Sequence, residues 1–167
     1  MILRRDCAIS ELVEKFLKIS SRVELSEWLG ISDRRLRFIL YGLKSSDRYR
    51  SFEVPKRNGG VRQIQAPTKA LLSIQKAVHE AISIIVKPSA IAHGYVRGKT
   101  IVDNAKPHRA RRWVVAIDLA DYFPSINFGR VRGAFLSAPF RFPPEVATCL
   151  AQICCLDDRL PGLPRLN

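Results

Sequence analysis

A short apolar stretch that ends in two aspartates constrains the fold of this chain more than any other feature. Residues 113–117 read Trp-Val-Val-Ala-Ile, and such a β-branched run is typical of a strand buried on both faces. Asp118 follows at once, and Asp121 comes three residues later, before Tyr122 and Phe123. A carboxylate at the end of a buried strand is costly unless something uses or pairs it. The stretch predicts either a two-metal phosphoryl-transfer site, where Asp118 contacts Mg²⁺, or an ordinary turn with a capping and a solvated aspartate.

The charge of the chain indicates the kind of partner. Its 167 residues include 28 Lys and Arg against 15 Asp and Glu, which gives a net charge of +13. Nucleic acid is the commonest partner of so basic a protein. An anionic membrane surface is the rival, but the sequence contains no long basic amphipathic helix and no apolar run that approaches the length of a membrane span.

The four cysteines do not suggest a metal site. None lies in a Cys-x-x-Cys pair, and Cys149, Cys154 and Cys155 share one apolar stretch. They are therefore predicted to be buried thiols in a reducing compartment. Because the N-terminus also lacks an apolar signal core, the sequence predicts a cytoplasmic protein without a membrane partner.

The first part of the chain is predicted to be helical, from residue 8 to 42. Two short helices joined at Gly30, the second capped by Ser32, would resemble a helix-turn-helix. The second helix carries Arg34, Arg35 and Arg37, which can reach phosphates. Helix pairs of this kind also occur in proteins that never read DNA, so both interpretations stay open.

A basic hairpin is predicted next. Residues 52–54 and 61–65 form the strands, and the loop between them contains two glycines that permit a positive φ. Lys56, Arg57 and Arg62 can contact a triphosphate or a nucleic-acid backbone, and an ordinary solvated hairpin is the alternative.

Four helical segments follow the hairpin. The segment 69–87 has a buried apolar stripe, and 101–105 begins a short helix. Further helices follow Ser125 or Asn127 and the pair Pro143–Pro144.

A polar cluster lies after residue 101. Asn104 and His108 are four residues apart and can share a helix face beside Arg109, Arg111 and Arg112. This cluster either binds a nucleic-acid backbone or only holds a loop together.

Four sequence blocks, taken in order, resemble the N-terminal part of bacterial retron-type reverse transcriptases. The resemblance covers about residues 52–162. The blocks are Phe52-x-Val54-Pro55-Lys56-Arg57-Asn58-Gly59-Gly60-Val61-Arg62-x-Ile64-x-Ala66-Pro67; Leu72, Ile74 and Gln75; His93-Gly94-Tyr95 with Ile101, Asn104, Ala105 and His108; and Asp118-Leu119-x-Asp121-Tyr122-Phe123-Pro124-Ser125-Ile126.

The resemblance implies an α+β fold with a helical N-terminal region at 1–48 and the fingers and an incomplete palm of a right-hand polymerase at 49–167. It implies an RNA-directed DNA polymerase that uses Mg²⁺, with a structured RNA template and an RNA/DNA hybrid as partners, and a role in defence against phage.

The resemblance also implies roles for individual residues. Asp118 and the backbone carbonyl of Leu119 match metal ligands, and Phe123 matches the aromatic position that excludes a 2′-hydroxyl. Lys56 and Arg62 match positions that hold the triphosphate, and Asp121 and Tyr122 border that pocket. Residues expected to contact the nucleic acid are Arg57, Asn104, His108, Arg109, Arg111 and Arg112.

The sequence departs from the family pattern at residues 160–167, where no Tyr-x-Asp-Asp motif follows. Cys155-Leu156-Asp157-Asp158 imitates that motif, but it follows a helical pattern and lies too soon after Asp118. The expectation is a truncated chain without useful polymerase activity, for which a second polypeptide would supply the rest of the palm and the thumb. The alternative is a non-catalytic nucleic-acid-binding protein that uses the helix pair and the basic hairpin.

Overall fold

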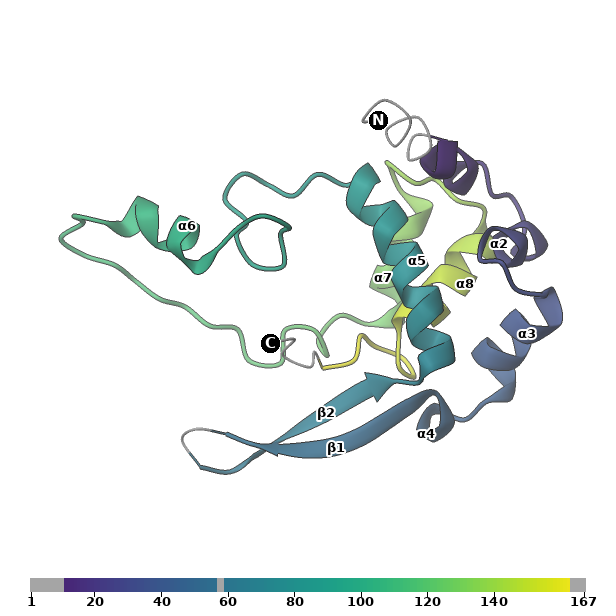
Figure 1. Ribbon diagram of the computed structural model, residues 1–167, viewed down its shortest axis with the longest axis horizontal. Coiled ribbons are helices and arrows are strands. Elements are labelled where there is room, and N and C mark those ends of the chain that lie inside the picture. The colour runs from purple at the N-terminus through teal and green to yellow at the C-terminus, as the bar shows by residue number, and fades with distance from the viewer. Residues whose placement is uncertain (1–10, 57–58, 163–167) are drawn as a thin grey trace, which may run out of the picture.

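The computed structural model describes residues 11–56 and 59–162, in which helices pack together and a two-stranded hairpin projects from them (Figure 1). Residues 11–17 are helical. The further elements are α2 (Arg22–Trp28), α3 (Asp33–Arg37), the π-helix η1 (Phe38–Gly42), α4 (Ser45–Arg48), β1 (Tyr49–Pro55), β2 (Val61–Pro67), α5 (Lys69–Ile85), α6 (Ile101–Ala105), the 3₁₀-helix η2 (Lys106–His108), α7 (Phe128–Leu136) and α8 (Pro144–Cys154). The mixture of helices and strands confirms the α+β class. None of the helices within the described ranges is long and apolar enough to cross a membrane.

The predicted helix pair is present near the N-terminus. Gly30 turns the chain between α2 and α3 with a φ of 69°. The Ser32 hydroxyl then accepts a hydrogen bond from the backbone N–H of Arg35, which confirms the predicted cap of α3. Leu25 and Leu36, one from each helix, are fully buried.

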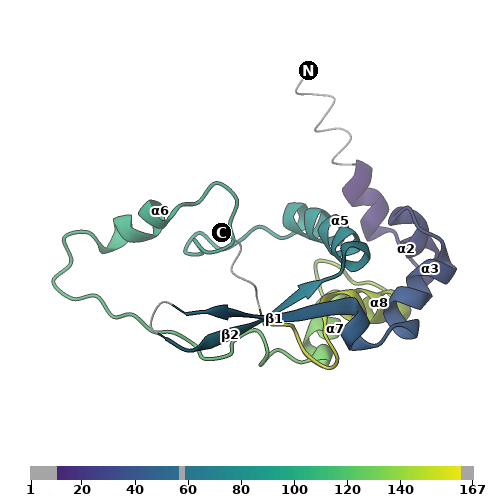
Figure 2. The ribbon, with the colours of Figure 1, turned by 60° about the horizontal axis from the view of Figure 1, so that its bottom comes forward.

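The hydrophobic core combines both ends of the chain with α5. On α5, the buried residues are Leu71, Ile74, Val78 and Ala81, as the apolar stripe predicts. Side chains without solvent exposure come from segments far apart in sequence: Phe16, Leu25, Leu36, Leu71, Leu150 and Ile153. Figure 2 shows α2, α3, α5, α7 and α8 gathered at one end of the molecule.

The hairpin is confirmed, and its strands are longer than predicted. β1 and β2 pair antiparallel from Tyr49 opposite Pro67 to Pro55 opposite Val61. Gly59 supplies a positive φ of 84° in the loop. Tyr49 at the root and Ile64 in the middle of β2 are buried, and the rest of β1 is exposed to solvent.

The prediction of a buried strand at 113–117 is wrong. The segment forms no strand, and Trp113 and Ile117 are 80% and 85% exposed. It belongs to the long segment that connects α5 to α7 and also carries α6 (Figure 1). A β-branched run becomes a buried strand only where neighbouring strands accept its hydrogen bonds and other layers of the fold cover its faces. Within the described ranges, β1 and β2 form the only sheet, and neither pairs with 113–117.

Candidate nucleotide and nucleic-acid site

The block that follows Asp118 ends in a tight turn fixed by backbone hydrogen bonds. Asp121 has a φ of 49°, a left-handed conformation that Asp tolerates better than most residues. Its carbonyl accepts from the Ser125 N–H at 3.0 Å, and the Phe123 carbonyl accepts from the Ile126 N–H at 3.0 Å. The Ile126 carbonyl in turn accepts from the Leu160 N–H at 3.0 Å. The C-terminal end of the block is therefore attached to the segment that follows α8.

The block and the hairpin approach each other at a small pocket. The pocket has a volume of about 230 Å³, and Gln65 of β2, Pro124 and residues 156–162 line it. Asp157 contacts the Ser45 hydroxyl, and the Asp158 carboxylate pairs with Arg159 at 2.8 Å. This ion pair lowers the pKa of Asp158. Both carboxylates of the motif-like sequence at 155–158 thus have partners from the protein itself.

Phe123 makes edge contacts with aromatic rings of two different blocks. Its ring centroid lies 5.3 Å from that of Tyr122, with an interplanar angle of 77°. It lies 6.3 Å from that of Tyr95, with an interplanar angle of 90°. Such edge-to-face arrangements stabilise aromatic pairs beyond their buried area. The structure therefore brings the His93-Gly94-Tyr95 block to the aspartate block, and the contact of Tyr95 was not predicted from the sequence.

The candidate metal ligands lie on the exposed N-terminal side of the same block. Asp118 is exposed, and Leu119 is 64% exposed. Across residues 11–56 and 59–162, no three His, Cys, Asp or Glu side chains come close enough to hold a metal ion. Asp118 with the Leu119 carbonyl therefore offers a partial set of oxygen ligands, and its role stays a prediction.

The hairpin carries its cations at the tip and along one face. The Lys56 N–H donates to the Gly60 carbonyl at 3.0 Å and closes the loop. Arg62 lies opposite Val54, and Arg50 lies opposite Ala66. Because opposing residues of an antiparallel pair share a face, Arg50 and Arg62 lie on the same face of the hairpin. Arg57 lies outside the described residues.

The polar cluster after residue 100 lies far from the helical core, on the segment between α5 and α7 that Figure 1 shows at the left. Asn104 lies in α6 and His108 ends η2, and no hydrogen bond between their side chains is present in the described part of the chain. Thr100 and Asp103 form a capping box at the start of α6. Hydrogen bonds from Lys106 and Thr100 lower the pKa of Asp103.

The arginines that follow His108 are exposed, and none of them pairs with a described carboxylate. The Arg111 Nε donates weakly to the Pro107 carbonyl at 3.4 Å, and the Arg112 guanidinium lies 5.9 Å from the centre of the Trp113 ring. Together with Arg109 they form a basic stretch beside the cluster.

Gln75 connects the hairpin root to two helices, a role that was not predicted from the sequence. Its Nε2 donates to the Tyr49 hydroxyl at 2.9 Å and to the Ile153 carbonyl at 2.8 Å. Ile153 lies in the last turn of α8, where backbone carbonyls have no partner within the helix. Gln75 therefore fixes the position of β1 against α5 and α8.

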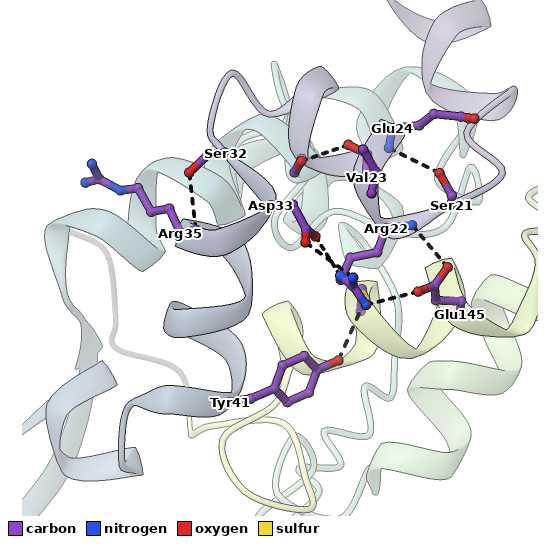
Figure 3. A network of polar contacts seen from close by, with 11 residues as sticks. Ser21, Arg22, Val23, Glu24, Ser32, Asp33, Arg35, Tyr41 and Glu145 are labelled. Atoms are coloured by element: carbon purple, nitrogen blue, oxygen red, sulfur yellow. Dashed lines mark hydrogen bonds and ion pairs between the residues drawn. The ribbon is translucent and has the colours of Figure 1, made fainter.

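A second network, also missed, joins the N-terminal helices to α8 (Figure 3). The Arg22 Nε donates to Asp33 at 2.6 Å, and its Nη1 donates to Glu145 at 3.1 Å. The hydrogen bond from Arg22 lowers the pKa of Asp33. Nearby, the Tyr41 hydroxyl lies 3.7 Å from the Cys149 Sγ, and burial raises the pKa of Tyr41 to about 12. Polar residues outside the apolar periodicity carry no signal for such long-range contacts.

No protein-family model matches the chain. The chain is 40% identical to the retron Mx65 reverse transcriptase of Myxococcus xanthus over 113 residues, which are 68% of this chain and 26% of that protein. It is 31% identical over 144 residues to the retron Se72 reverse transcriptase of Salmonella heidelberg, covering 86% of this chain and 37% of the relative. It is also 31% identical over 144 residues to the retron Ec86 reverse transcriptase of Escherichia coli, covering 84% and 44%. The chain thus spans less than half the length of these curated relatives. On this similarity, which extends over most of its own length, the chain belongs to the family of retron reverse transcriptases.

Proposed function

We propose that this chain contributes the fingers and part of the palm to an RNA-directed DNA polymerase of the retron type. In this proposal, residues 1–48 form a helical N-terminal region, and the polymerase part begins at residue 49. The observation that carries the proposal is the 31–40% identity to three retron reverse transcriptases over 68–86% of the chain.

Asp118 and the carbonyl of Leu119 are the residues proposed to hold Mg²⁺. Both offer the hard oxygen atoms that Mg²⁺ prefers, and both are accessible. Since Mg²⁺ in such sites takes one or two protein carboxylates together with substrate phosphates, this partial set is compatible with the ion. A bound Mg²⁺ neutralises negative charge on the phosphates.

The protein side chains proposed to bind the nucleotide have separate tasks. Lys56 and Arg62 contact the triphosphate, for which the forked guanidinium of Arg62 is suited to two oxygen atoms at once. Phe123 packs against the sugar and excludes a 2′-hydroxyl, and Asp121 and Tyr122 border this pocket. The edge contacts of Phe123 with two other rings support the role, because they restrict the orientation of its ring.

The RNA template and the RNA/DNA hybrid are proposed to follow the basic surfaces. Exposed cations that neutralise phosphates dominate the affinity of such complexes. The residues proposed to contact the backbone are Arg57, Asn104, His108, Arg109, Arg111 and Arg112. The net charge of +13 supports a polyanionic partner independently of the family.

The proposal is tested with a chimera in which residues of the retron Ec86 reverse transcriptase are replaced by the 144 matched residues of this chain. The chimera is expected to extend a primer on an RNA template, and Asp118→Asn is expected to abolish the extension. Glu80→Gln, which neutralises an exposed carboxylate of α5, is the control and should extend as before. Extension that persists in the Asp118→Asn chimera would contradict the proposed role.

The 167-residue polypeptide by itself is expected to show no primer extension. Two-metal catalysis takes carboxylates from more than one place in the fold, and the sequence offers Asp118 as the one aspartate matched to a metal ligand of the family. Extension by the purified polypeptide that disappears in Asp118→Ala would overturn this expectation. Whether a second polypeptide restores synthesis stays a prediction, to be tested by adding the remaining part of a relative.

The second candidate is a non-catalytic nucleic-acid-binding protein. The exposed arginines of α3 and Arg50 of the hairpin favour it. Binding of this kind should survive EDTA and weaken steeply with salt. A chimera that lacks all primer extension, together with EDTA-resistant binding by the polypeptide, would favour this candidate over the polymerase.

A further inference from the structure

The continuous helix formed by α3 and η1 carries two arginines and two aromatic rings on its exposed side. We propose that this side binds single-stranded nucleic acid, with its rings stacked on bases and its arginines against phosphates. We call it the α3–η1 face and define it by Arg34, Arg37, Phe38 and Tyr41. It does not include any residue of the proposed nucleotide site, and it gives the second candidate function, which also uses the arginines of α3, a defined surface and a single-stranded ligand.

The four residues of the face are exposed and lie within two turns of one helix, which changes from α to π at Phe38. Leu36, Ile39 and Leu40 of the same helix are buried. Phe38 and Tyr41 nevertheless remain 58% and 55% exposed. Two large rings facing solvent on one helix side, next to cations, are the usual components of a platform for single strands.

Contacts with the protein hold both rings in place. A Cβ atom at Gly42 would lie 2.8 Å from the Cδ2 of Phe38, so the ring of Phe38 rests directly on Gly42. The Tyr41 hydroxyl lies 3.7 Å from the Cys149 Sγ of α8, and Figure 3 shows the side chain directed toward the network around Arg22. Rings that are already held lose less conformational freedom when a base stacks on them.

The charge of the face is compensated only in part, because Arg37 acts on the carboxylate of Asp33 without pairing with it. Among the described residues, neither Arg34 nor Arg37 forms an ion pair. The nearby carboxylates of Asp33 and Glu145 pair with Arg22 instead. Two arginines that form no ion pair among the described residues, in a chain of net charge +13, are complementary to a phosphate backbone. A single strand is favoured over a duplex because only a single strand presents the faces of its bases to the rings.

The test measures binding of fluorescein-labelled 12-nucleotide oligo(U) RNA and oligo(dT) DNA by fluorescence anisotropy. The full 167-residue polypeptide carries Lys56→Gln and Arg62→Gln, so that the hairpin contributes less. In this background, Phe38→Leu and Tyr41→Leu are each expected to weaken binding by roughly 5- to 150-fold, the range for loss of one stacked base. Arg34→Ala and Arg37→Ala should each lower the slope of log K against log salt by about 0.7.

Two controls separate stacking from structural damage. Tyr41→Phe keeps the ring and removes only the contact with Cys149, so it should bind like the parent. Arg130→Ala removes an exposed arginine of α7, off the face, and should change the Kd little. If Phe38→Leu and Tyr41→Leu bind as tightly as Arg130→Ala, or if Tyr41→Phe loses as much as Tyr41→Leu, the proposal is wrong. Equal affinity for a duplex of the same length would also overturn it.

A measurement on the unsubstituted polypeptide keeps the test decisive if a variant does not fold. Oligo(U) containing 4-thiouridine should crosslink to the tryptic peptide of residues 38–44, which contains both rings. Crosslinks confined to other peptides would overturn the proposal. Because the face lies apart from Lys56, Arg62 and Asp118, either result leaves the primer-extension test of the polymerase proposal untouched.

Discussion

At the scale of single residues, Arg48 stands out because its charge is buried without a counter-charge. Only 6% of the residue is exposed, and its Nε and Nη1 have no hydrogen-bond partner among the described residues. Arg48→Met should therefore raise the free energy of unfolding, by about 1–3 kcal/mol, because it removes buried donors that make no bond. Urea unfolding measures the change. Arg50→Met, at the exposed neighbouring position, is the control and should stay within about 0.5 kcal/mol. A loss of stability in Arg48→Met would mean that the guanidinium has a partner.

Asp33 gives a prediction about pH. The hydrogen bond from Arg22 lowers its pKa in the folded state, so the ion pair stabilises the fold above the unfolded pKa and is lost as the pH falls through the folded pKa. Asp33→Asn should melt at a lower temperature than the parent at pH 6, and the difference should shrink as the pH falls below about 4. Melting curves from pH 6 to pH 2 measure this. A difference that stays constant over this range would show that the charge of Asp33 does not contribute.

At the scale of elements, the sequence predicts best what depends on local pattern. The stripe of α5, the cap at Ser32 and the hairpin with its glycines all follow from periodicity and turn chemistry. Of the two predicted caps of α7, Ser125 and Asn127, the structure uses Asn127. The residues of the candidate site can also be found in the sequence, through the four blocks. How these residues lie relative to one another in space cannot be predicted from the sequence. The contact of Tyr95 with Phe123 joins two blocks 28 residues apart, and no local pattern indicates it.

The features that the sequence did not predict have one physical cause: each depends on contacts with segments far away in the chain. Residues 113–117 have the composition of a buried strand, but a strand also needs at least one partner strand, and none of the described strands pairs with them. Gln75 lies outside the apolar stripe of α5, so its two hydrogen bonds are invisible to a periodicity argument. Arg22 lies among several other arginines and gives no local sign of its two carboxylate partners.

Gln75 provides the prediction at this scale, because it joins β1, α5 and α8. Gln75→Leu leaves the carbonyl of Ile153 and the hydroxyl of Tyr49 without their donor, and each is mostly removed from solvent. The free energy of unfolding should fall by about 1–3 kcal/mol. Chemical denaturation measures it, with Lys76→Ala at the adjacent exposed position as the control. If both variants unfold at the same denaturant concentration, Gln75 does not hold the three elements together.

At the scale of the whole molecule, the segment that connects α5 to α7 exposes large apolar side chains. Val115 and Ile117 are 83% and 85% exposed, and a β-branched segment of this kind tends to pair with another chain. The double variant Val115→Lys, Ile117→Lys should reduce concentration-dependent association without lowering the melting temperature, since neither side chain belongs to the core. Light scattering during size-exclusion chromatography measures the association. If the parent and the double variant associate to the same extent, the surface responsible for association lies elsewhere in the protein.

The ion pair between Arg22 and Glu145 has a consequence for how the chain is made. Its partners are 123 residues apart in sequence, yet it attaches the second helix to the last one. A ribosome adds about 5–20 residues per second, so the interval between the synthesis of Arg22 and that of Glu145 is roughly 6–25 s. During that interval Leu25 and Leu36 lack the apolar surface that later covers them. The nascent chain is therefore expected to recruit chaperones until Glu145 has emerged, and ribosome profiling of chaperone-bound nascent chains should show this occupancy ending once α8 is complete.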